Sequence, residues 1–224
     1  MTAPAPAPVV DLSFAHRWQA EILPARPLIL PARHFVYPRQ AEEVERGVLE
    51  LLIRPAGEDE QTLVELCRFP PFRQEEGERM GHGTSVRPSQ AAEHFLATCA
   101  LGFLDPAVPT GIWSSPNPYE ICAVSGGYAY LIDTSDPDRF TMLPYRPVLE
   151  VRPLPAQGLL LFVGHRSILA WGRDGQAWHA ERLSSEGVAI ASIDASVLHG
   201  LGWDLFTGKE IPFALDLRTG LRIA

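Results

Sequence analysis

The chain has 224 residues, of which 46% are hydrophobic and 21% charged, a composition typical of a globular protein with a buried core. Its 19 basic and 27 acidic residues give a net charge of -8, and Lys209 is the only lysine. No basic stripe is therefore available to neutralise phosphates, and we expect no binding to nucleic acid or to an anionic membrane.

The cysteines indicate a reducing compartment. Cys67, Cys99 and Cys122 are widely spaced, form no C-x-x-C pair and lie within apolar runs, where a free thiol behaves as a small hydrophobic group. The amino terminus lacks the basic and apolar regions of a signal peptide, and no apolar run approaches the roughly 18 residues of a membrane span. We expect a soluble protein of the cytoplasm.

The first 30 residues are rich in proline and show no clear period. We expect them to form a proline-rich tail, disordered or polyproline-like over its first ten residues, with Trp18 and residues 22–30 lying along the body. Residues 31–224 are then expected to form a single, mostly β domain, because all-β domains of this length are often one unit.

Residues 46–103 predict a first sheet portion. Two apolar runs, Val48–Ile53 and Thr62–Phe69, flank a polar loop and form a hairpin candidate. The alternative for the first run is a helix over residues 40–53, which Gly47 interrupts. Residues 70–89, with two prolines and a charged run, indicate a long exposed loop of the kind that is often functional.

The end of this portion is ambiguous between helix and strand. Ser89 is a suitable N-cap for a short helix over residues 89–96. The following run, residues 97–103, is read as a buried strand, with a continuing helix as the alternative.

Residues 119–224 predict a β-meander, and its turns predict individual hairpins. Gly126-Gly127 supplies the positive φ angles of a primed two-residue turn. If Asp174-Gly175 is also a two-residue turn, Trp171 faces Trp178 across the strands and pins the register. A weaker turn is expected at Asp194-Ala195.

The fold class expected from these patterns is all-β, an antiparallel hairpin meander with at most one or two short helices. Apolar runs recur at the 8 to 12 residues typical of sandwiches and barrels. A coarse repeat in residues 122–133, 161–172 and 190–201 suggests a propeller-like or barrel-like array. Three such units do not close a ring, so we expect residues 46–103 to complete the sheet system and any site to lie where the two parts meet.

Two resemblances add to this interpretation. Ala214-Leu215-Asp216-Leu217-Arg218-Thr219-Gly220 resembles the A-x-D-x-x-T-G repeat of quinoprotein-like and WD40-like β-propellers, and Trp203–Lys209 resembles a looser copy. The segments 99–134 and 199–204 are similar to a family of bacterial proteins that has no assigned activity. The first resemblance implies propeller-like packing, without quinone binding, and the second brings no function.

The candidates for chemistry are incomplete. Residues 81–85 (G-H-G-T-S) imitate an oxyanion or phosphate loop but lack a G-x-S-x-G elbow and a Gly-Lys-Ser/Thr ending. The acidic run 133–138 lacks the spacing of an EF-hand and fits turn chemistry. No histidine pair has zinc-ligand spacing. We expect no metal and no cofactor.

The aromatic residues carry the clearest functional hint, because Trp is enriched both in binding hot spots and in cores. The candidate ligand- or partner-binding residues are Trp113, Trp171, Trp178, Trp203, His165 and His199. The abundance of hairpins and the absence of a complete catalytic motif favour a non-catalytic intracellular binding or scaffold module whose partner is a protein, a small molecule or a second copy in a homodimer. The alternatives are a small hydrolase with a site near residues 81–85 and a ligand sensor with a Trp-lined pocket.

Overall fold

The fold is all-β, as predicted. A computed structural model describes residues 7–39, 48–56 and 94–223, and these residues form sixteen strands and one short 3-10 helix. The second strand of the predicted hairpin, the loop 70–89 and most of the predicted helix at 89–96 lie outside the described residues. Phe95 and Leu96, the last two residues of that predicted helix, belong instead to a strand.

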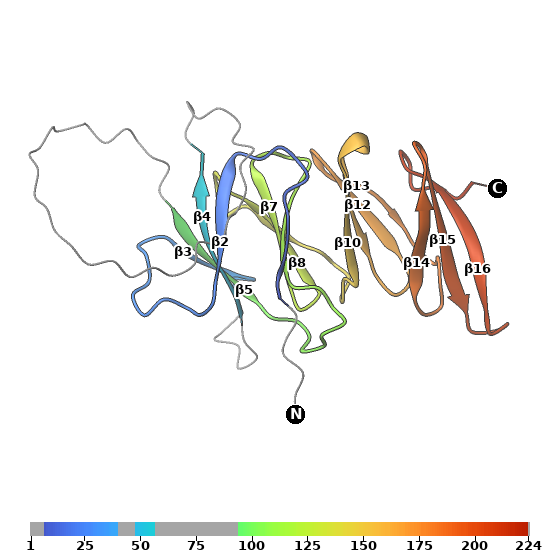
Figure 1. Cartoon of the computed structure of the whole chain (residues 1–224), viewed down its shortest axis with the longest axis horizontal. Coiled ribbons are helices and arrows are strands. Elements are labelled where there is room, and N and C mark those ends of the chain that lie inside the picture. Colours follow the sequence, from blue (N-terminus) through green and yellow to red (C-terminus); the bar gives the residue numbers. More distant parts are fainter. Residues whose placement is uncertain (1–6, 40–47, 57–93, 224) are drawn as a thin grey trace, which may run out of the picture.

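The strands form four sheets that follow one another along the longest axis of the molecule (Figure 1). The first sheet has the order β2-β4-β5-β3, and the second β1-β6-β7-β8-β9. The third sheet has the order β10-β11-β12-β13, and the terminal sheet β14-β15-β16. All neighbouring strands pair antiparallel except β1 with β6 and β3 with β5, which are parallel.

The bounds of the strands are as follows. The first sheet contains β2 (Trp18–Leu23), β4 (Val48–Pro55), β5 (Phe95–Ala100) and β3 (His34–Tyr37), and the second β1 (Val9–Asp11), β6 (Gly111–Ser114), β7 (Glu120–Ser125), β8 (Tyr128–Asp133) and β9 (Phe140–Met142). The third contains β10 (Glu150–Leu154), β11 (Leu159–Val163), β12 (Ile168–Gly172) and β13 (Gly175–Ala180), and the terminal sheet β14 (Val188–Ile193), β15 (Val197–Asp204) and β16 (Lys209–Asp216). The 3-10 helix, Pro155–Gln157, joins β10 to β11.

Three apolar cores fill the spaces between successive sheets, and their residues alternate along the strands because neighbouring side chains point to opposite faces. The first core packs Leu51 and Phe95 of the first sheet with Tyr130 of the second. The second core packs Leu131 against the third sheet, and the third core packs the third sheet against Leu198 of the terminal sheet. The second and third sheets are therefore covered on both faces.

The expected amino-terminal tail contributes two strands to this stack. β1 lies parallel to β6, and a Cβ at Gly111 would come within 2.0 Å of the Val9 carbonyl oxygen, so this close approach requires glycine. Trp18, at the start of β2, is buried in the first core. Because prolines are abundant in this segment, its composition predicts a tail, although the segment contains two short strand-forming runs, V-V-D and the alternating W-Q-A-E-I-L.

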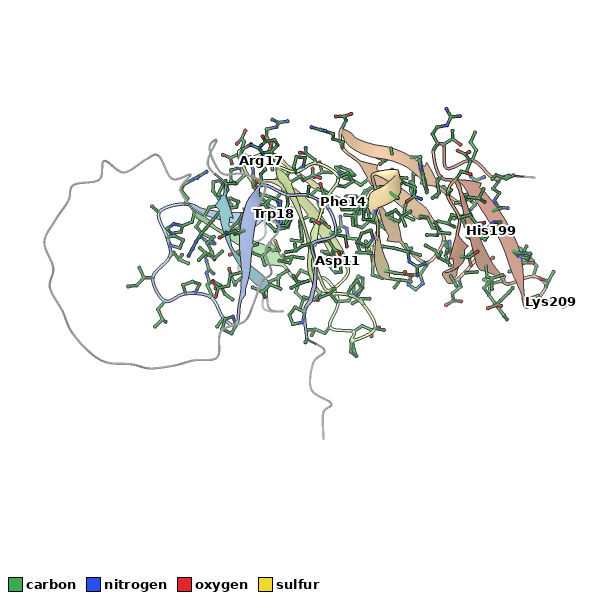
Figure 2. The ribbon with its side chains drawn as sticks, turned by 45° about the horizontal axis from the view of Figure 1, so that its top comes forward. Asp11, Phe14, Arg17, Trp18, His199 and Lys209 are labelled. Carbon is green, nitrogen blue, oxygen red and sulfur yellow. The ribbon has the colours of Figure 1, made fainter. Side chains whose placement is uncertain are left out.

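Residues 12–17, which we call the strap, cross the end of the second sheet between these two strands. The Phe14 N–H donates to Ser114 Oγ over 2.9 Å, and the Arg17 N–H donates to the Pro118 carbonyl over 2.7 Å. Phe14 lies in the second core while Trp18, directly after the strap, lies in the first. Figure 2 labels Phe14, Arg17 and Trp18 in this region. The strap thus links two of the three cores.

Two of the predicted hairpins are present. Gly126 and Gly127 have φ angles of 55° and 74° and form the two-residue turn that pairs Ser125 with Tyr128. β14 and β15 also form a hairpin, but the Asp194 N–H donates to the Val197 carbonyl, so the turn is Ala195-Ser196, one residue later than predicted.

The predicted facing of Trp171 and Trp178 is wrong. The turn between β12 and β13 is Arg173-Asp174, so that Gly172 pairs with Gly175 and Trp171 with Gln176. A bulge then shifts the register, and Trp178 pairs with Ala170. The extra residue turns the two indoles to opposite faces of the third sheet, Trp171 into the second core and Trp178 into the third.

Two of the three cysteines fall in the described residues, and both are free. Cys99 lies in the first core and Cys122 in the second, and burial raises the pKa of both thiols well above the ordinary value. They behave as small hydrophobic groups, as the sequence predicts. No helix among the described residues is long and apolar enough to cross a membrane.

Candidate interaction surface

The terminal sheet is the last layer of the stack, and one of its faces is not covered by any described element. Its inner face places Leu198, Phe213 and Leu215 in the third core. Its strand register assigns the alternate positions to the opposite side, which we call the outer face. The outer face carries Ala189, Ser192, Val197, His199, Leu201, Trp203, Glu210, Pro212, Ala214 and Asp216.

Glycines on the inner side of β15 explain why its large side chains point outward. A Cβ at Gly200 would lie 2.3 Å from the Phe213 ring, and one at Gly202 would lie 2.1 Å from the Leu183 carbonyl oxygen. The Phe213 ring of the third core and the loop before β14 therefore pack directly against the backbone of β15 at these two glycines. Between Leu198 and Asp204, only the alternate residues His199, Leu201 and Trp203 carry side chains beyond Cα, and these face outward.

Trp203 is the largest apolar group of the outer face, with 39% of the residue exposed. The backbone N–H of Trp203 donates to Ser184 Oγ over 2.8 Å, and the Trp203 backbone carbonyl accepts the Ser185 N–H over 2.7 Å. These bonds to the loop before β14 fix the backbone that carries the indole. Trp203 is thus presented to solvent on a rigid support, which lowers the entropy that binding would cost.

The two histidines of the predicted site lie on this sheet and at its rim. His199 Nε2 lies 3.3 Å from Asp194 Oδ2, and both side chains are exposed, so the pair contributes little to stability. His165 lies in the exposed turn between β11 and β12, and its carbonyl accepts the Gly187 N–H over 2.9 Å. The structure therefore brings Trp203 and His199 onto one face and places His165 near the loop that supports it.

The other three candidate tryptophans are core residues. Trp113, Trp171 and Trp178 are 3%, 6% and 6% exposed. The Trp171 indole donates to Glu120 Oε1 over 2.7 Å, and the Trp178 indole donates to the Leu217 carbonyl over 2.6 Å. Trp113 and Trp171 share the second core while Trp178 lies in the third, so these three side chains do not line one pocket.

The charges of the terminal sheet are mostly negative and gather at its two ends. Residues 188–216 contain four acidic residues and one lysine. The strand register places Asp194 and Asp216 at one end, and Asp204 and Glu210 at the other. Hydrogen bonds from the Thr207 and Thr219 side chains lower the pKa of Asp204 and Asp216, which keeps both carboxylates charged at neutral pH.

A polar cluster that the sequence did not reveal lies around Glu120 at the start of β7. Its Oε1 accepts the Ser115 hydroxyl over 2.9 Å and the Trp171 indole over 2.7 Å. Burial raises the pKa of this carboxyl, although the two hydrogen bonds oppose the effect. Glu120 joins the second sheet to the third, and no sequence motif marks it.

A second cluster, also unmarked in the sequence, crosses three strands of the first sheet. The Thr98 hydroxyl donates to Glu50 Oε2 over 2.6 Å, so it accepts from His34 Nε2, which lies 2.8 Å away. Glu50 is 2% exposed, and its Oε1 has no hydrogen-bond partner among the described residues. Burial, and then the charge of Arg26, lower the pKa of His34. This chain of groups ties β4, β5 and β3 together.

The described residues contain no group of three or more His, Cys, Asp or Glu side chains arranged to hold a metal ion. In the acidic run 133–138, Asp133 Oδ1 accepts the Ser135 N–H and hydroxyl and the Asp136 N–H, which is turn chemistry. Residues 81–85 lie outside the described residues. No protein-family model matches the sequence, and a search of curated proteins finds no match.

Proposed function

We propose that the protein is a non-catalytic binding module and that the outer face of the terminal sheet is its binding surface. One observation carries the proposal. The two middle sheets bury both faces in apolar cores, whereas the terminal sheet leaves a face with Trp203, Leu201 and Pro212 without any described cover. Exposed apolar surface of this kind marks interaction sites in soluble proteins.

The size of the outer face selects the kind of partner. Three strands about 4.8 Å apart and up to about 26 Å long give a footprint of about 400 Å². Stable complexes between two domains bury about 800 Å² per partner. The outer face therefore suits one extended segment better than a whole domain.

The charges of the face define the chemistry of that segment. Carboxylates lie at both ends of its apolar strands, Asp194 and Asp216 at one end and Glu210 at the other, whereas the register places Asp204 on the inner side of β15. A complementary partner is an extended apolar segment with a positive charge at each end. Opposite charges at the ends fix the register of such a segment more than they add to its affinity.

Two further features belong to this proposal. The face-to-face packing of successive, mostly antiparallel sheets supports the propeller-like interpretation of the repeats. The two buried free thiols support a reducing compartment such as the cytoplasm.

A peptide array tests the proposal. The array contains ten-residue peptides that have three central Leu or Ile residues and are flanked by Arg, by Ser or by Glu. Binding of the purified protein to each peptide is measured at low and high salt. We expect the Arg-flanked peptides to bind best and to lose binding as salt rises, because screening weakens attraction between exposed charges. Trp203→Ser should weaken this binding at least about tenfold, because buried aromatic anchors dominate such interfaces.

Leu104→Ser is the matched control, since Leu104 is an exposed apolar residue of the loop between β5 and β6. It should leave peptide binding unchanged. Equal binding by the Trp203→Ser protein, or equal binding to all three flanking types, would contradict the proposal. Thermal unfolding of each variant shows whether a loss of binding comes from a loss of fold.

A further inference from the structure

The edge of β16 that faces away from β15 is already occupied along part of its length. Residues 221–223 run antiparallel to it. The Asp216 N–H donates to the Leu221 carbonyl over 2.9 Å, and the Ile223 N–H donates to the Ala214 carbonyl over 2.9 Å. These two backbone groups of β16 are therefore not available to a strand that a partner would add to the sheet.

The rest of this edge contains Pro212. Backbone groups alternate in direction along a strand, so those of Glu210 and Pro212 point the same way as those of Ala214 and Asp216, away from β15. Proline has no N–H, and Pro212 therefore offers only its carbonyl at this edge. Proline in an edge strand disfavours regular pairing with a further strand.

The opposite edge of the terminal sheet belongs to β14, which lies on the other side of β15 (Figure 1). The register shifts between Ile190 and Ser192, so Ala191 is an extra residue without a partner in β15. A bulge of this kind interrupts the regular spacing of backbone groups and increases the local twist, which protects an edge from pairing. Both edges of the terminal sheet are therefore unsuited to strand addition.

A segment bound on the outer face thus makes its contacts through side chains rather than through backbone pairing. Polyproline II is the extended conformation suited to this, because it leaves the backbone solvated and proline holds it in shape before binding. The outer face offers apolar groups on which such segments dock. Pro212 lies directly beside Leu201, and Trp203, 39% exposed, is the next outward residue of β15.

We propose that the outer face recognises a segment in the polyproline II conformation, with apolar residues and prolines in its middle and a positive charge at each end. This inference rests on the proposed function, because it uses the same binding surface. Glu210 and Asp216 are six residues, or about 20 Å, apart along β16. A polyproline II segment of about seven residues covers that distance, so its end charges reach both carboxylates.

Three peptides test the conformation of the segment, each with an Arg at both ends and three central leucines. The leucines are separated by valine, by proline or by N-methylated valine. Valine favours strands and keeps every N–H, whereas proline favours polyproline II and lacks the N–H. Binding to the full chain is measured by titration calorimetry. We expect the proline peptide to bind at least about tenfold more tightly than the valine peptide, because less conformational entropy is lost.

N-methylation of the valine peptide should change its affinity by less than about threefold, because no backbone N–H of the segment takes part in binding. Trp203→Ser should weaken the proline peptide at least about tenfold. The control Leu104→Ser should bind all three peptides like the wild type.

A valine peptide that binds but loses affinity on N-methylation would overturn the inference, because the segment would then pair as a strand. Proline and valine peptides of equal affinity would overturn it too, since the preformed conformation would bring no advantage. In either case, binding of the valine peptide that is lost in Trp203→Ser would leave the proposed function standing. Absence of binding by all three peptides would remove both.

Discussion

Glu120 shows how one partly buried group joins two layers of the fold. Its carboxylate accepts hydrogen bonds from Ser115, which directly follows β6, and from Trp171 of the third sheet. Both donors stabilise the charged form, yet burial outweighs them and raises the pKa above its ordinary value of 4.5. The nearby charge of Asp133 acts in the same direction as burial. The two hydrogen bonds therefore offset only part of the desolvation cost of this carboxylate.

The substitution Glu120→Gln should change how stability depends on pH. When the pKa of a carboxyl is higher in the folded than in the unfolded protein, the folded protein binds more protons. The stabilising contribution of that carboxyl is therefore complete below its unfolded pKa and is lost as the pH rises through its folded pKa. Gln has no such titration, and its amide oxygen still accepts from Ser115 and Trp171. Thermal unfolding between about pH 4 and pH 8 should show the variant gaining stability relative to the wild type as pH rises.

The Ser115→Ala protein is the control for this measurement, because it keeps the titrating carboxyl and should retain the wild-type direction of pH dependence. A difference between Glu120→Gln and the wild type that stays constant over the whole pH range would show that Glu120 has an ordinary pKa.

At the scale of elements, the strap links the first and second cores without forming a strand of either sheet. Phe14 inserts into the second core, and its backbone N–H is satisfied by the Ser114 hydroxyl at the end of β6. Residues 9–11 precede the strap as β1, and Trp18 follows it as the first residue of β2. One buried side-chain hydrogen bond thus positions a segment that spans the end of the second sheet.

The substitution Ser114→Ala should destabilise the protein by about 1–3 kcal/mol, because it leaves the buried Phe14 N–H without an acceptor. Urea unfolding followed by intrinsic fluorescence measures this change. Ser13→Ala is the matched control, since its hydroxyl bonds to Asp11 at an exposed position, and it should cost less than about 0.5 kcal/mol. Equal effects of the two substitutions would mean that the strap contributes no buried hydrogen bond.

The elements differ in how far the sequence predicts them, and the reason is local. Paired glycines fix the turn at Gly126-Gly127, and that hairpin follows the prediction. The β12–β13 hairpin departs from it, because a bulge between Ala170 and Trp171 depends on packing against two cores and has no sequence marker. β1 escapes prediction for another reason: a three-residue strand carries too few positions to show a period.

The candidate surface is predictable in part, for a reason tied to layers. β11 is buried on both faces, and its sequence is a continuous apolar run, L-L-L-F-V. Such a run has no polar positions that would mark an exposed face, so the sequence of the third sheet does not show whether its Trp residues are buried or exposed. β15 alternates instead, with glycines inside and His199, Leu201 and Trp203 outside. Its alternation is the sequence signal that separates Trp203 from Trp113, Trp171 and Trp178.

At the scale of the whole molecule, the stack predicts an uneven distribution of stability. The third sheet has four strands and lies between the second and third cores, whereas the terminal sheet has three strands and contacts only the third core. The free energy that protects a strand depends on the apolar surface it buries. The terminal sheet is therefore the layer that separates most easily from the rest.

Native-state hydrogen exchange on the monomer at low concentration should resolve this order. Backbone amides of β15, such as Leu201, should exchange through openings that cost at least about 2 kcal/mol less than those protecting Leu161 of β11, because opening the terminal sheet sacrifices one core while opening the third sacrifices two. Added denaturant should merge the two groups only near the global unfolding transition. Amides of β7, which also lie between two cores, serve as the control and should behave like those of β11. Equal protection of β15 and β11 would mean that the four sheets unfold as one cooperative unit, and that the terminal sheet has no independent tendency to open.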